Sequence, residues 1–240
     1  MGKNIFENDR LIFKPFQQLT ENEKELIIKS WSNPFNARYN ATKDARKSVE
    51  NISNLLEPTF NDLGNYYDNM YFRAVFDKKI DGLVGTCRFG KFYKSKTIDC
   101  WDFGFNVLLK YWYKGYGVEI LGNIVEIAKS EGAKTIVGSA DAENFSSYKA
   151  MIKNKFIYSG LDGDGDFIYS LDLKSPNISD DEINKNWNRH LLMAKERLGA
   201  KKYCKLEQVN AKTFEMVKRI WAGEDEDLLV KYYNELILTI

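Results

Sequence analysis

The sequence has few of the residues that build metal sites and disulfide frameworks. Its 240 residues include three cysteines and one histidine. The cysteines, Cys87, Cys100 and Cys204, do not form a CxxC motif, and their number is odd. A zinc site needs clustered cysteine and histidine ligands, and a disulfide framework needs paired cysteines. We therefore expect no metal ion and a reducing, cytoplasmic location.

A strong net charge and a long apolar run are also missing. Lysine and arginine number 35 against 34 aspartates and glutamates, so the formal net charge is only +1. Partners such as nucleic acid or an anionic membrane favour a large basic excess, so neither is expected. No run is long enough to span a bilayer, and the first ten residues lack the apolar segment of a signal peptide. Phe6 also stands where a myristoylation signal has serine or threonine.

The rest of the composition is that of a folded globular chain. Hydrophobic residues make up 44% and charged residues 29%, a balance with which 240 residues bury a full core. The pattern changes after Lys174, where Ser175-Pro176-Asn177 indicates a linker and helical spacing follows. We therefore expect a mixed domain over residues 1–174 and a helical extension over residues 175–240.

Hydrophobic periodicity predicts the order of elements. Strands are expected at residues 10–16, 70–76, 82–92, 96–109, 134–140, 156–161 and 167–173. Helices are expected at residues 20–33, 42–56, 118–129, 145–154, 179–199, 211–222 and 225–238. Two capping boxes support helix starts: Thr20 with Glu23, and Ser179 with Glu182. Pro58 should end the second helix. The short apolar run 134–140 is typical of a parallel strand that is buried on both faces.

The acidic run Asp162-Gly-Asp-Gly-Asp166 is compatible with a calcium loop or with a hairpin turn. An EF-hand loop that began at Asp162 would need glycine at position 167 and glutamate at position 173. The chain has Phe167 and Leu173 there, so a glycine-rich hairpin turn is expected.

A glycine turn follows the apolar run 103–109. Gly115 and Gly117 let the backbone curl tightly before a helix begins. Apolar residues then recur at helical spacing: Val118, Leu121, Val125 and Ala128. The first turn of such a helix has N–H groups without intrahelical partners, so it can bind a phosphate. The Rossmann pattern lacks its third glycine here, and no lysine and hydroxyl follow Gly115 as in a P-loop. A turn without a ligand is the remaining alternative.

The stretch from Gly104 to Phe156 resembles the GNAT superfamily of acyl-CoA-dependent N-acyltransferases. The superfamily loop Q/R-x-x-G-x-G/A corresponds to residues 112–117, with Trp112 where glutamine or arginine is commoner. That tryptophan and the run Gly-Tyr-Gly-Val-Glu are similar to the branch that holds ribosomal-protein N-terminal, aminoglycoside and polyamine acetyltransferases. In that branch a Gly-Phe pair follows the helix, and this chain has Lys155 in place of the glycine and Phe156 at the phenylalanine. The branch pattern D-p-x-N-x-x-S-x-x-x-x-x-K is matched by Asp141, Asn144, Ser147 and Lys153.

The resemblance implies a fold that mixes helices and strands, of class α+β (α/β). Its GNAT-like sheet is mixed, mostly antiparallel and twisted, with a parallel splayed strand pair and flanking helices. The helical extension would follow it.

The resemblance also implies acetyl-CoA as co-substrate, without a metal ion. The donor would lie where the strand at 103–109 splays from the strand at 135–140. Main-chain N–H groups would bind its pyrophosphate and the developing oxyanion. The pyrophosphate residues are Lys114, Gly115, Tyr116, Gly117 and Val118, and the oxyanion residues are Asn106, Val107 and Leu108. Asn144 would bind the pantetheine arm, Ser147 would lie near the thiol, and Lys153 would meet a phosphate. For Lys114 and Lys153, a solvated surface lysine is the alternative.

The implied acceptor is a primary amine, of a small molecule or of a peptide N-terminus. An amine with a pKa of ~10.4 costs roughly 4 to 5 kcal/mol to neutralise at pH 7, whereas an α-amine costs about 1. Asp102, two residues before Gly104, is the candidate base, and Asp99 is a reserve. A strand carboxylate that faces solvent is the alternative for Asp102. Acceptor-side residues would be Trp31, Phe35, Arg38 and Tyr39, unless these side chains merely pack the helical layer.

The general acid is less defined. Many relatives have a tyrosine where this chain has Met151, so Ser147 or Tyr148 would donate the proton to the leaving thiolate. We therefore expect an N-acetyltransferase that works by direct transfer in a ternary complex. The alternative is a weak or inactive acyl-CoA-binding sensor or assembly module whose working surface is the helical tail. The apolar stripes of that tail are expected to pack against each other or against the main sheet, and a homodimer contact or a wall of the acceptor pocket is the alternative.

Overall fold

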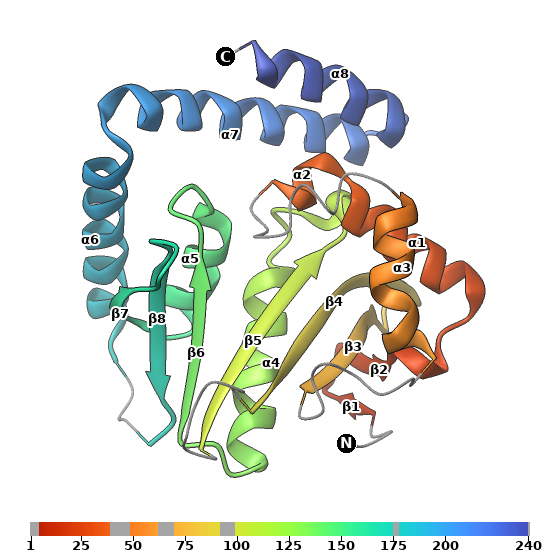
Figure 1. Ribbon diagram of the computed structural model, residues 1–240, viewed down its shortest axis with the longest axis horizontal. Helices are drawn as coiled ribbons and strands as arrows, with labels where there is room; N and C mark the ends of the chain where they lie inside the picture. The colour runs from red at the N-terminus through yellow and green to blue at the C-terminus, as the bar shows by residue number, and fades with distance from the viewer. Residues whose placement is uncertain (1–4, 39–48, 62–69, 92–98, 175–177, 240) are drawn as a thin grey trace.

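An eight-stranded sheet lies at the centre of the molecule, with helices on both of its faces (Figure 1). The computed structural model describes residues 5–38, 49–61, 70–91, 99–174 and 178–239. The strand order is β1-β2-β3-β4-β5-β6-β8-β7. The strands are β1 (Phe6–Glu7), β2 (Leu11–Pro15), β3 (Met70–Asp77), β4 (Gly82–Lys91), β5 (Cys100–Val107), β6 (Thr135–Ala140), β7 (Ile157–Leu161) and β8 (Phe167–Asp172).

The helices alternate with these strands and then form the end of the chain. The α-helices are α1 (Glu21–Ser32), α2 (Pro34–Ala37), α3 (Val49–Phe60), α4 (Tyr116–Ser130), α5 (Phe145–Lys153), α6 (Asp180–Leu198), α7 (Ala200–Trp221) and α8 (Glu226–Leu238). Short 3₁₀ helices, η1 (Phe16–Gln18) and η3 (Leu109–Tyr111), follow β2 and β5.

Strand pairing confirms the predicted mixed sheet. Neighbouring strands pair antiparallel except for β5 and β6, which pair in parallel. Helix α4 links the two parallel strands, so they form a crossover unit. The predicted hairpins β3–β4 and β7–β8 are both present.

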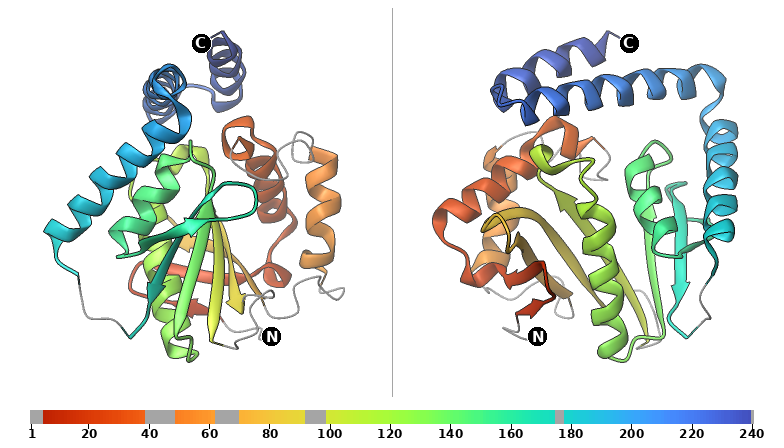
Figure 2. Two further views of the ribbon diagram at one scale, coloured as in Figure 1. Left: turned by 60° about the vertical axis from the view of Figure 1, so that its left-hand side comes forward. Right: turned by 180° about the vertical axis from the view of Figure 1, so that it is seen from behind.

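Two apolar layers cover the sheet. The larger layer packs α4 and α5 against one face, around residues such as Phe89, Trp101 and Ile120. The smaller layer packs α1 and α3 against the other face, around Phe16 and Ile27. A third cluster joins α2 and η3 to α7 and α8. Helices therefore lie on both faces of the sheet, as Figure 2 shows, while Ser139 of β6 and alternate residues of β7 remain exposed.

The predicted helix starts agree with the caps. At α1, Thr20 and Glu23 form both halves of the capping box. At α6, the Ser179 side chain accepts a hydrogen bond from the Glu182 N–H at 3.3 Å. These side chains accept hydrogen bonds from backbone N–H groups that have no acceptor within the first turn of the helix.

The prediction that Pro58 ends the second helix is wrong. Helix α3 continues to Phe60, with Pro58 inside it. Proline removes one hydrogen bond, but Thr59 and Phe60 are buried beyond it, and the Phe60 ring packs 5.3 Å from that of Phe16. Burial of these side chains offsets the lost bond. Residues 42–48 of the expected helix lie outside the described residues.

Two other expectations need correction. Helix α7 begins at Ala200, 11 residues before the expected start at residue 211. Its first half shows no clear apolar stripe, yet Leu206 is buried there. Strand β6 was expected to be buried on both faces, but Ser139 is exposed while Gly138 and Ala140 are buried. The face that carries Ser139 is less buried because the described cluster under α1 and α3 contains no residue of β6.

The helical tail is fixed to the sheet domain through α6. Ala194 belongs to the main core, and Trp187 packs against the same cluster. Gly199, with φ of +75°, ends α6 and caps α7. Helix α7 then crosses above the sheet, and α8 folds back beside it (Figure 1). None of the helices in the described ranges is long and apolar enough to cross a membrane.

His190 lies buried where α6 meets the sheet. Its Nδ1 is 2.9 Å from the Tyr169 hydroxyl, and its ring stacks on Trp187. Burial lowers the pKa of His190 from 6.5 to about 4, so the neutral form is favoured in the folded protein.

This burial predicts a pH-dependent stability. Between pH 6.5 and 4 the unfolded chain binds a proton that folded His190 does not, so stability is complete above pH 6.5 and falls as the pH decreases. We expect the free energy of unfolding to fall by about 2 kcal/mol between pH 7 and pH 5 through this residue. Urea unfolding of the wild type and of His190→Gln at both pH values measures the difference. Equal pH dependence of the two proteins would contradict the assignment.

Candidate functional site

Strands β5 and β6 pair over a very short length. Cys100, Trp101 and Asp102 pair with residues 135–137, and no pairing follows. On their other sides, β5 stays paired with β4 to Val107, and β6 stays paired with β8 to Ala140. The two strands therefore diverge towards their carboxyl ends, as Figure 1 shows. Main-chain groups along this splay can pair with an extended ligand, as at a sheet edge.

A packing contact fixes the point where the splay begins. A Cβ atom added to Gly138 would lie 2.5 Å from Cζ of Phe103, so the ring occupies the space of a side chain on β6. The Phe103 ring also meets Phe156 edge to face, with centroids 5.4 Å apart. The aromatic ring thus lies over Gly138 on the sheet face that carries α4 and α5, directly beyond the last paired residues.

The glycine loop lies at the end of β5 and begins α4. Gly115 caps the helix with φ of +85°, a left-handed conformation that favours glycine. The Trp112 indole N–H donates to the Val107 carbonyl at 2.8 Å. The unusual tryptophan therefore fastens the loop to the strand. Val118, one of the predicted phosphate donors, directs its N–H to the Gly115 carbonyl at 3.1 Å.

The first turn of α4 is held by an ionic network. The Tyr116 hydroxyl donates to Asp77 at 2.7 Å, and Arg10 contacts Asp77 and Glu119 at 2.7 Å each. Burial alone would raise the pKa of Asp77, but hydrogen bonds from Tyr116, Lys79 and Arg10 lower it below its usual value. Asp77 is therefore a structural carboxylate that positions the helix.

Alternation along β5 distinguishes the three residues that the sequence predicts as oxyanion donors. The Leu108 N–H donates to the Val84 carbonyl of β4 at 3.0 Å. Because successive backbone groups of a strand point in opposite directions, the Val107 N–H points towards the splay. Asn106 has the same parity as Leu108 and pairs with Thr86 on β4. Val107 is thus the one of the three whose N–H faces β6.

The predicted pantetheine residues lie at the start of α5. The Asn144 side chain accepts a hydrogen bond from the Ser147 N–H at 3.2 Å and caps the helix. Ser147 is half-buried in the first turn, whereas Lys153 is exposed at the end of the helix. Lys114, on the other side of the splay, stacks over the Trp221 ring at 5.0 Å.

Tyr148 is fully buried beneath β6. Its hydroxyl donates to the Ala140 carbonyl, and burial raises the pKa of Tyr148 far above its usual value. The hydroxyl is therefore held against the strand and is a very weak acid.

Asp102 lies on the sheet face that carries α1, opposite α4. Its carboxylate forms an ion pair with Arg88 of β4 at 2.8 Å. On the same face, the Trp31 indole N–H donates to the Thr86 hydroxyl at 2.9 Å. The structure thus brings Asp102, Trp31 and two polar residues of β4 to one surface next to the splay.

The other predicted acceptor residues have different surroundings. Phe35 is buried in the cluster that joins α2 to the tail, as in the packing alternative. Arg38 lies over the Phe35 ring, with its guanidinium carbon 5.3 Å from the ring centroid. Tyr39 lies outside the described residues.

Sequence reasoning did not identify Arg88 or the tail contacts of the site. Strand alternation alone places Arg88 on one face of β4, but only the register brings it to Asp102. In the tail, Lys202 pairs with Glu143, next to Asn144. No local pattern indicates that contact, because the two residues are distant in sequence.

Comparisons with known proteins agree on one family. A family model described as an acetyltransferase (GNAT) domain matches residues 10–157, more than half of the chain. A comparison with curated protein sequences gives no match. Among solved structures, a GNAT-family acetyltransferase from Bacillus anthracis has a TM-score of 0.56 at 17% identity, covering 72% of this chain and 100% of that one.

Two further similar structures contain coenzyme A. A ribosomal-protein alpha-N-acetyltransferase in complex with coenzyme A has a TM-score of 0.55 at 12% identity and covers 70% of this chain and 98% of its own. The aminoglycoside acetyltransferase AAC(6′)-Ib, in complex with ribostamycin and coenzyme A, has a TM-score of 0.57 at 12% identity. It covers 72% of this chain and 99% of its own. At these identities the likeness concerns the fold.

The contact between Phe103 and Gly138 predicts the effect of a single methyl group. Gly138→Ala should lower the free energy of unfolding by ~1–3 kcal/mol, because the rigid ring has to move. Gly82→Ala is the control, since its added Cβ would meet its nearest neighbours at an ordinary 3.6 Å. Urea unfolding measures both changes. Adding Phe103→Leu should restore part of the loss, and strict additivity of the two substitutions would contradict the contact.

Proposed function

Because this chain belongs to the GNAT acetyltransferase family, we propose that it transfers the acetyl group of acetyl-CoA to a primary amine by direct attack in a ternary complex. The observation that carries this proposal is the three-residue pairing of β5 and β6 beside a glycine-capped helix. An acyl-pantetheine arm is extended and rich in amides, so it can pair with main-chain groups of diverging strands. Its pyrophosphate would then meet the first turn of α4.

The donor contacts follow from this placement. Gly115, Tyr116 and Gly117 offer main-chain N–H groups to the pyrophosphate, while Val118 shares its N–H with the Gly115 carbonyl. The Asn144 oxygen is engaged by its own helix, so its amide nitrogen is the group offered to the pantetheine arm. Lys114 and Lys153 would contribute positive charge near the phosphates.

The amine would attack from the face that carries Asp102. The attack forms a bond from nitrogen to the carbonyl carbon, and the Val107 N–H is placed to stabilise the oxyanion. Asp102 would accept the amine proton, directly or through a water molecule. Arg88 fixes the orientation of the carboxylate by occupying one of its oxygens.

Collapse of the intermediate breaks the carbon–sulfur bond and releases the thiolate of coenzyme A. Ser147 is the better placed of the two expected proton donors, because the Tyr148 hydroxyl is bound to Ala140. A thiol with a pKa near ~8.5 also leaves with little assistance. A proton donor to the thiolate would therefore matter less for the rate than the base that accepts the proton of the amine.

The acceptor is proposed by class only. Similar structures include a ribosomal-protein N-acetyltransferase and a complex with the aminoglycoside ribostamycin. They support a peptide N-terminus or a small-molecule amine as acceptor. The whole catalytic sequence would require neither a metal ion nor a covalent enzyme intermediate.

Two contacts favour a second function, an acyl-CoA-binding sensor or assembly module. The Asp102 carboxylate is paired with Arg88, and the Tyr148 hydroxyl is bound to the Ala140 carbonyl, so the candidate base and one candidate acid are both engaged in other contacts. Such a protein would bind acetyl-CoA without turning it over, and its tail would contact a partner.

Incubation with acetyl-CoA and a panel of amines distinguishes these functions. The panel contains peptides with free N-termini, an aminoglycoside and spermidine, and release of the free thiol is measured with a thiol reagent. We expect release that depends on at least one amine. Clear acetyl-CoA binding by calorimetry without any release would contradict the enzyme and favour the sensor.

The role of Asp102 is tested by Asp102→Asn. Removal of a general base should lower kcat/KM by about 10²-fold or more and leave acetyl-CoA affinity unchanged. Asp99→Asn is the matched comparison: Asp99 is the reserve base from the sequence, but its carboxylate pairs with Lys134, so this variant should keep a normal rate. A normal rate in Asp102→Asn, or an equal loss in both variants, would remove Asp102 from the mechanism.

A further inference from the structure

Helix α6 lies beside the β7–β8 hairpin at the edge of the sheet (Figures 1 and 2), and a cavity of about 240 Å³ lies between them. Five residues of α6 and three of the hairpin line it: Glu182, Asn186, Arg189, His190, Met193, Ile157, Tyr158 and Tyr169. At 100° per residue, the five helix residues fall within one stripe of about 100°. None of these lining residues belongs to β5, β6 or the glycine loop, so the cavity is separate from the proposed acetyl-CoA site.

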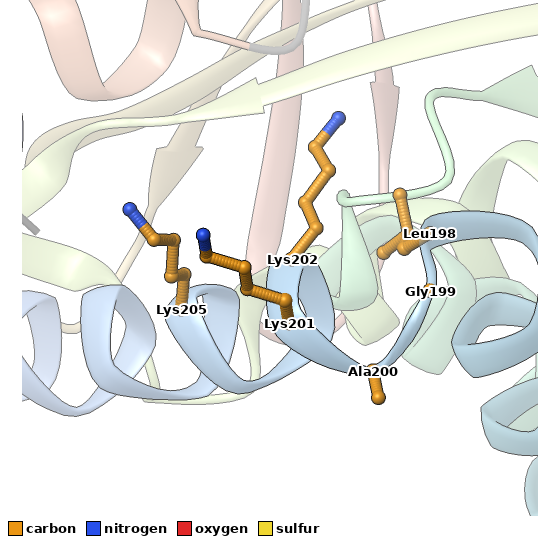
Figure 3. A pocket seen from close by; sticks show the side chains of 6 residues that line it. All are labelled: Leu198, Gly199, Ala200, Lys201, Lys202 and Lys205. Atoms are coloured by element: carbon orange, nitrogen blue, oxygen red, sulfur yellow. The ribbon is translucent and has the colours of Figure 1, made fainter.

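A larger cavity of about 350 Å³ lies at the corner between α6 and α7 and has a different character (Figure 3). Its charged side chains are Lys201, Lys202 and Lys205, which are all exposed. Lys202 already pairs with Glu143. Exposed lysines are solvated without a ligand, so this corner indicates no binding site. The cavity beside the hairpin differs because buried polar atoms occur in its lining.

Two residues that line the hairpin cavity each have a buried nitrogen atom without a hydrogen-bond partner in the described part of the chain. These atoms are Nε2 of His190 and Nδ2 of Asn186. His190 is buried completely, at 0% exposure. Buried polar groups in folded proteins are nearly always hydrogen-bonded, because an unpaired one loses its hydration without compensation. A molecule bound in the cavity would supply partners to both atoms.

The contact between His190 and Tyr169 identifies the kind of partner that is needed. The Tyr169 hydroxyl lies 2.9 Å from Nδ1 of His190, its only hydrogen-bond partner within the described residues. Tyr169 is 1% exposed, so its O–H needs an acceptor inside the protein. The O–H therefore donates to Nδ1, and the single N–H of the neutral imidazole lies at Nε2. Nδ2 of Asn186 is also a donor, so both atoms require acceptors.

Arg189 brings a positive charge to these donors. Burial raises the pKa of Tyr169, and the Arg189 guanidinium opposes that rise, so its charge acts on the same hydroxyl. Glu182 lies on the same stripe but about 10 Å away from Arg189 along the helix axis. One cation beside two N–H donors favours a group with a single negative charge and two acceptor oxygens. Glu182 at the other end disfavours a dianion.

The nearest acidic residues of the described chain do not engage these donors. Burial raises the pKa of Tyr148, and Asp166 and Asp141 add to the rise. The ring of Tyr148 lies against that of His190, with centroids 4.1 Å apart. The pKa of His190, in contrast, is lowered by burial alone. A carboxylate next to the imidazole would act in the opposite direction, so the Nε2 donor remains for a ligand.

The other walls of the cavity are apolar or aromatic. Ile157 and Met193 line it together with Tyr158 and Tyr169, whose ring centroids are 5.9 Å apart in an edge-to-face arrangement. Apolar walls with a few placed polar groups are typical of small-molecule sites. A volume of about 240 Å³ suits a compact molecule and is too small for coenzyme A.

We infer that the cavity between α6 and the β7–β8 hairpin binds a small organic acid. Its carboxylate would accept hydrogen bonds from Asn186, Arg189 and His190, and its apolar body would lie against Tyr158 and Tyr169. This site goes beyond the proposed acetyltransferase function and does not depend on it.

His190 is the only histidine of the chain, so its imidazole reports on this site without ambiguity. Benzoate is the probe, and benzamide and benzylamine are its neutral and cationic counterparts. Nitrogen-15 NMR spectra are recorded at neutral pH on the tag-free chain with labelled histidine. We expect a proton on Nε2 of the free protein and a saturable change of the ring signals with benzoate. The affinity for benzoate should exceed that for benzamide and benzylamine by about tenfold or more.

Three results would overturn the inference. They are a proton on Nδ1 of the free protein, no saturable change with benzoate, and stronger binding of benzylamine or inorganic phosphate than of benzoate. A cavity that holds only water gives the second result. Coenzyme A should leave the affinity for benzoate unchanged, since the two sites share no lining residue. Displacement of benzoate by coenzyme A would place the acid in the splay and would also overturn the assignment.

Substitutions on the α6 stripe locate the bound benzoate. Asn186→Asp keeps the shape of the side chain but sets a carboxylate against that of benzoate, and Arg189→Gln removes the cation. Each should weaken benzoate binding by about tenfold or more, measured by calorimetry and by the His190 signals. The matched controls, Asn188→Asp and Lys195→Gln, make the same changes at exposed positions on the opposite side of α6. Unchanged affinity in Asn186→Asp with normal circular dichroism, or equal losses in the controls, would overturn the inference.

Discussion

The short parallel pairing of β5 with β6 is the constraint on which the rest of the site depends. Three residue pairs hold the strands together, and the Phe103 ring packs over Gly138 directly beyond them. Antiparallel neighbours on the outer sides continue to pair with both strands beyond that point. The sheet can therefore stay open there without unfolding, because pairing on the outer sides compensates for the pairing that is missing between β5 and β6.

Local signals were sufficient for much of the fold. The glycine loop, the Thr20 capping box and the hairpins depend on residues close in sequence, and each was predicted from them. The full lengths of α3 and α7 were not predicted. Burial of Phe60 by distant elements outweighs the helix-breaking effect of Pro58 in α3, and burial of Leu206 outweighs the polar sequence at the start of α7. In the same way, Asp102 could be selected from the sequence, but its pairing with Arg88 depends on strand register.

The tail is joined to the donor side and the acceptor side at once. Its α7 contacts the glycine loop through Phe214 and the turn before α5 through Lys202, while α8 contacts α1 through Asp227. One continuous helical segment thus contacts both the glycine loop and the helices on the face of Asp102.

Gly199 turns the chain from α6 into α7 without any intervening residue. A 22-residue helix is a rod of about 33 Å, so α7 reaches from the end of α6 to the glycine loop. At its far end, Met216 and Val217 are buried and the Trp221 indole N–H donates to the Lys110 carbonyl. Helix α7 is therefore a strut that is held at both ends, and it links the seat of α6 on the sheet to the loop that begins α4.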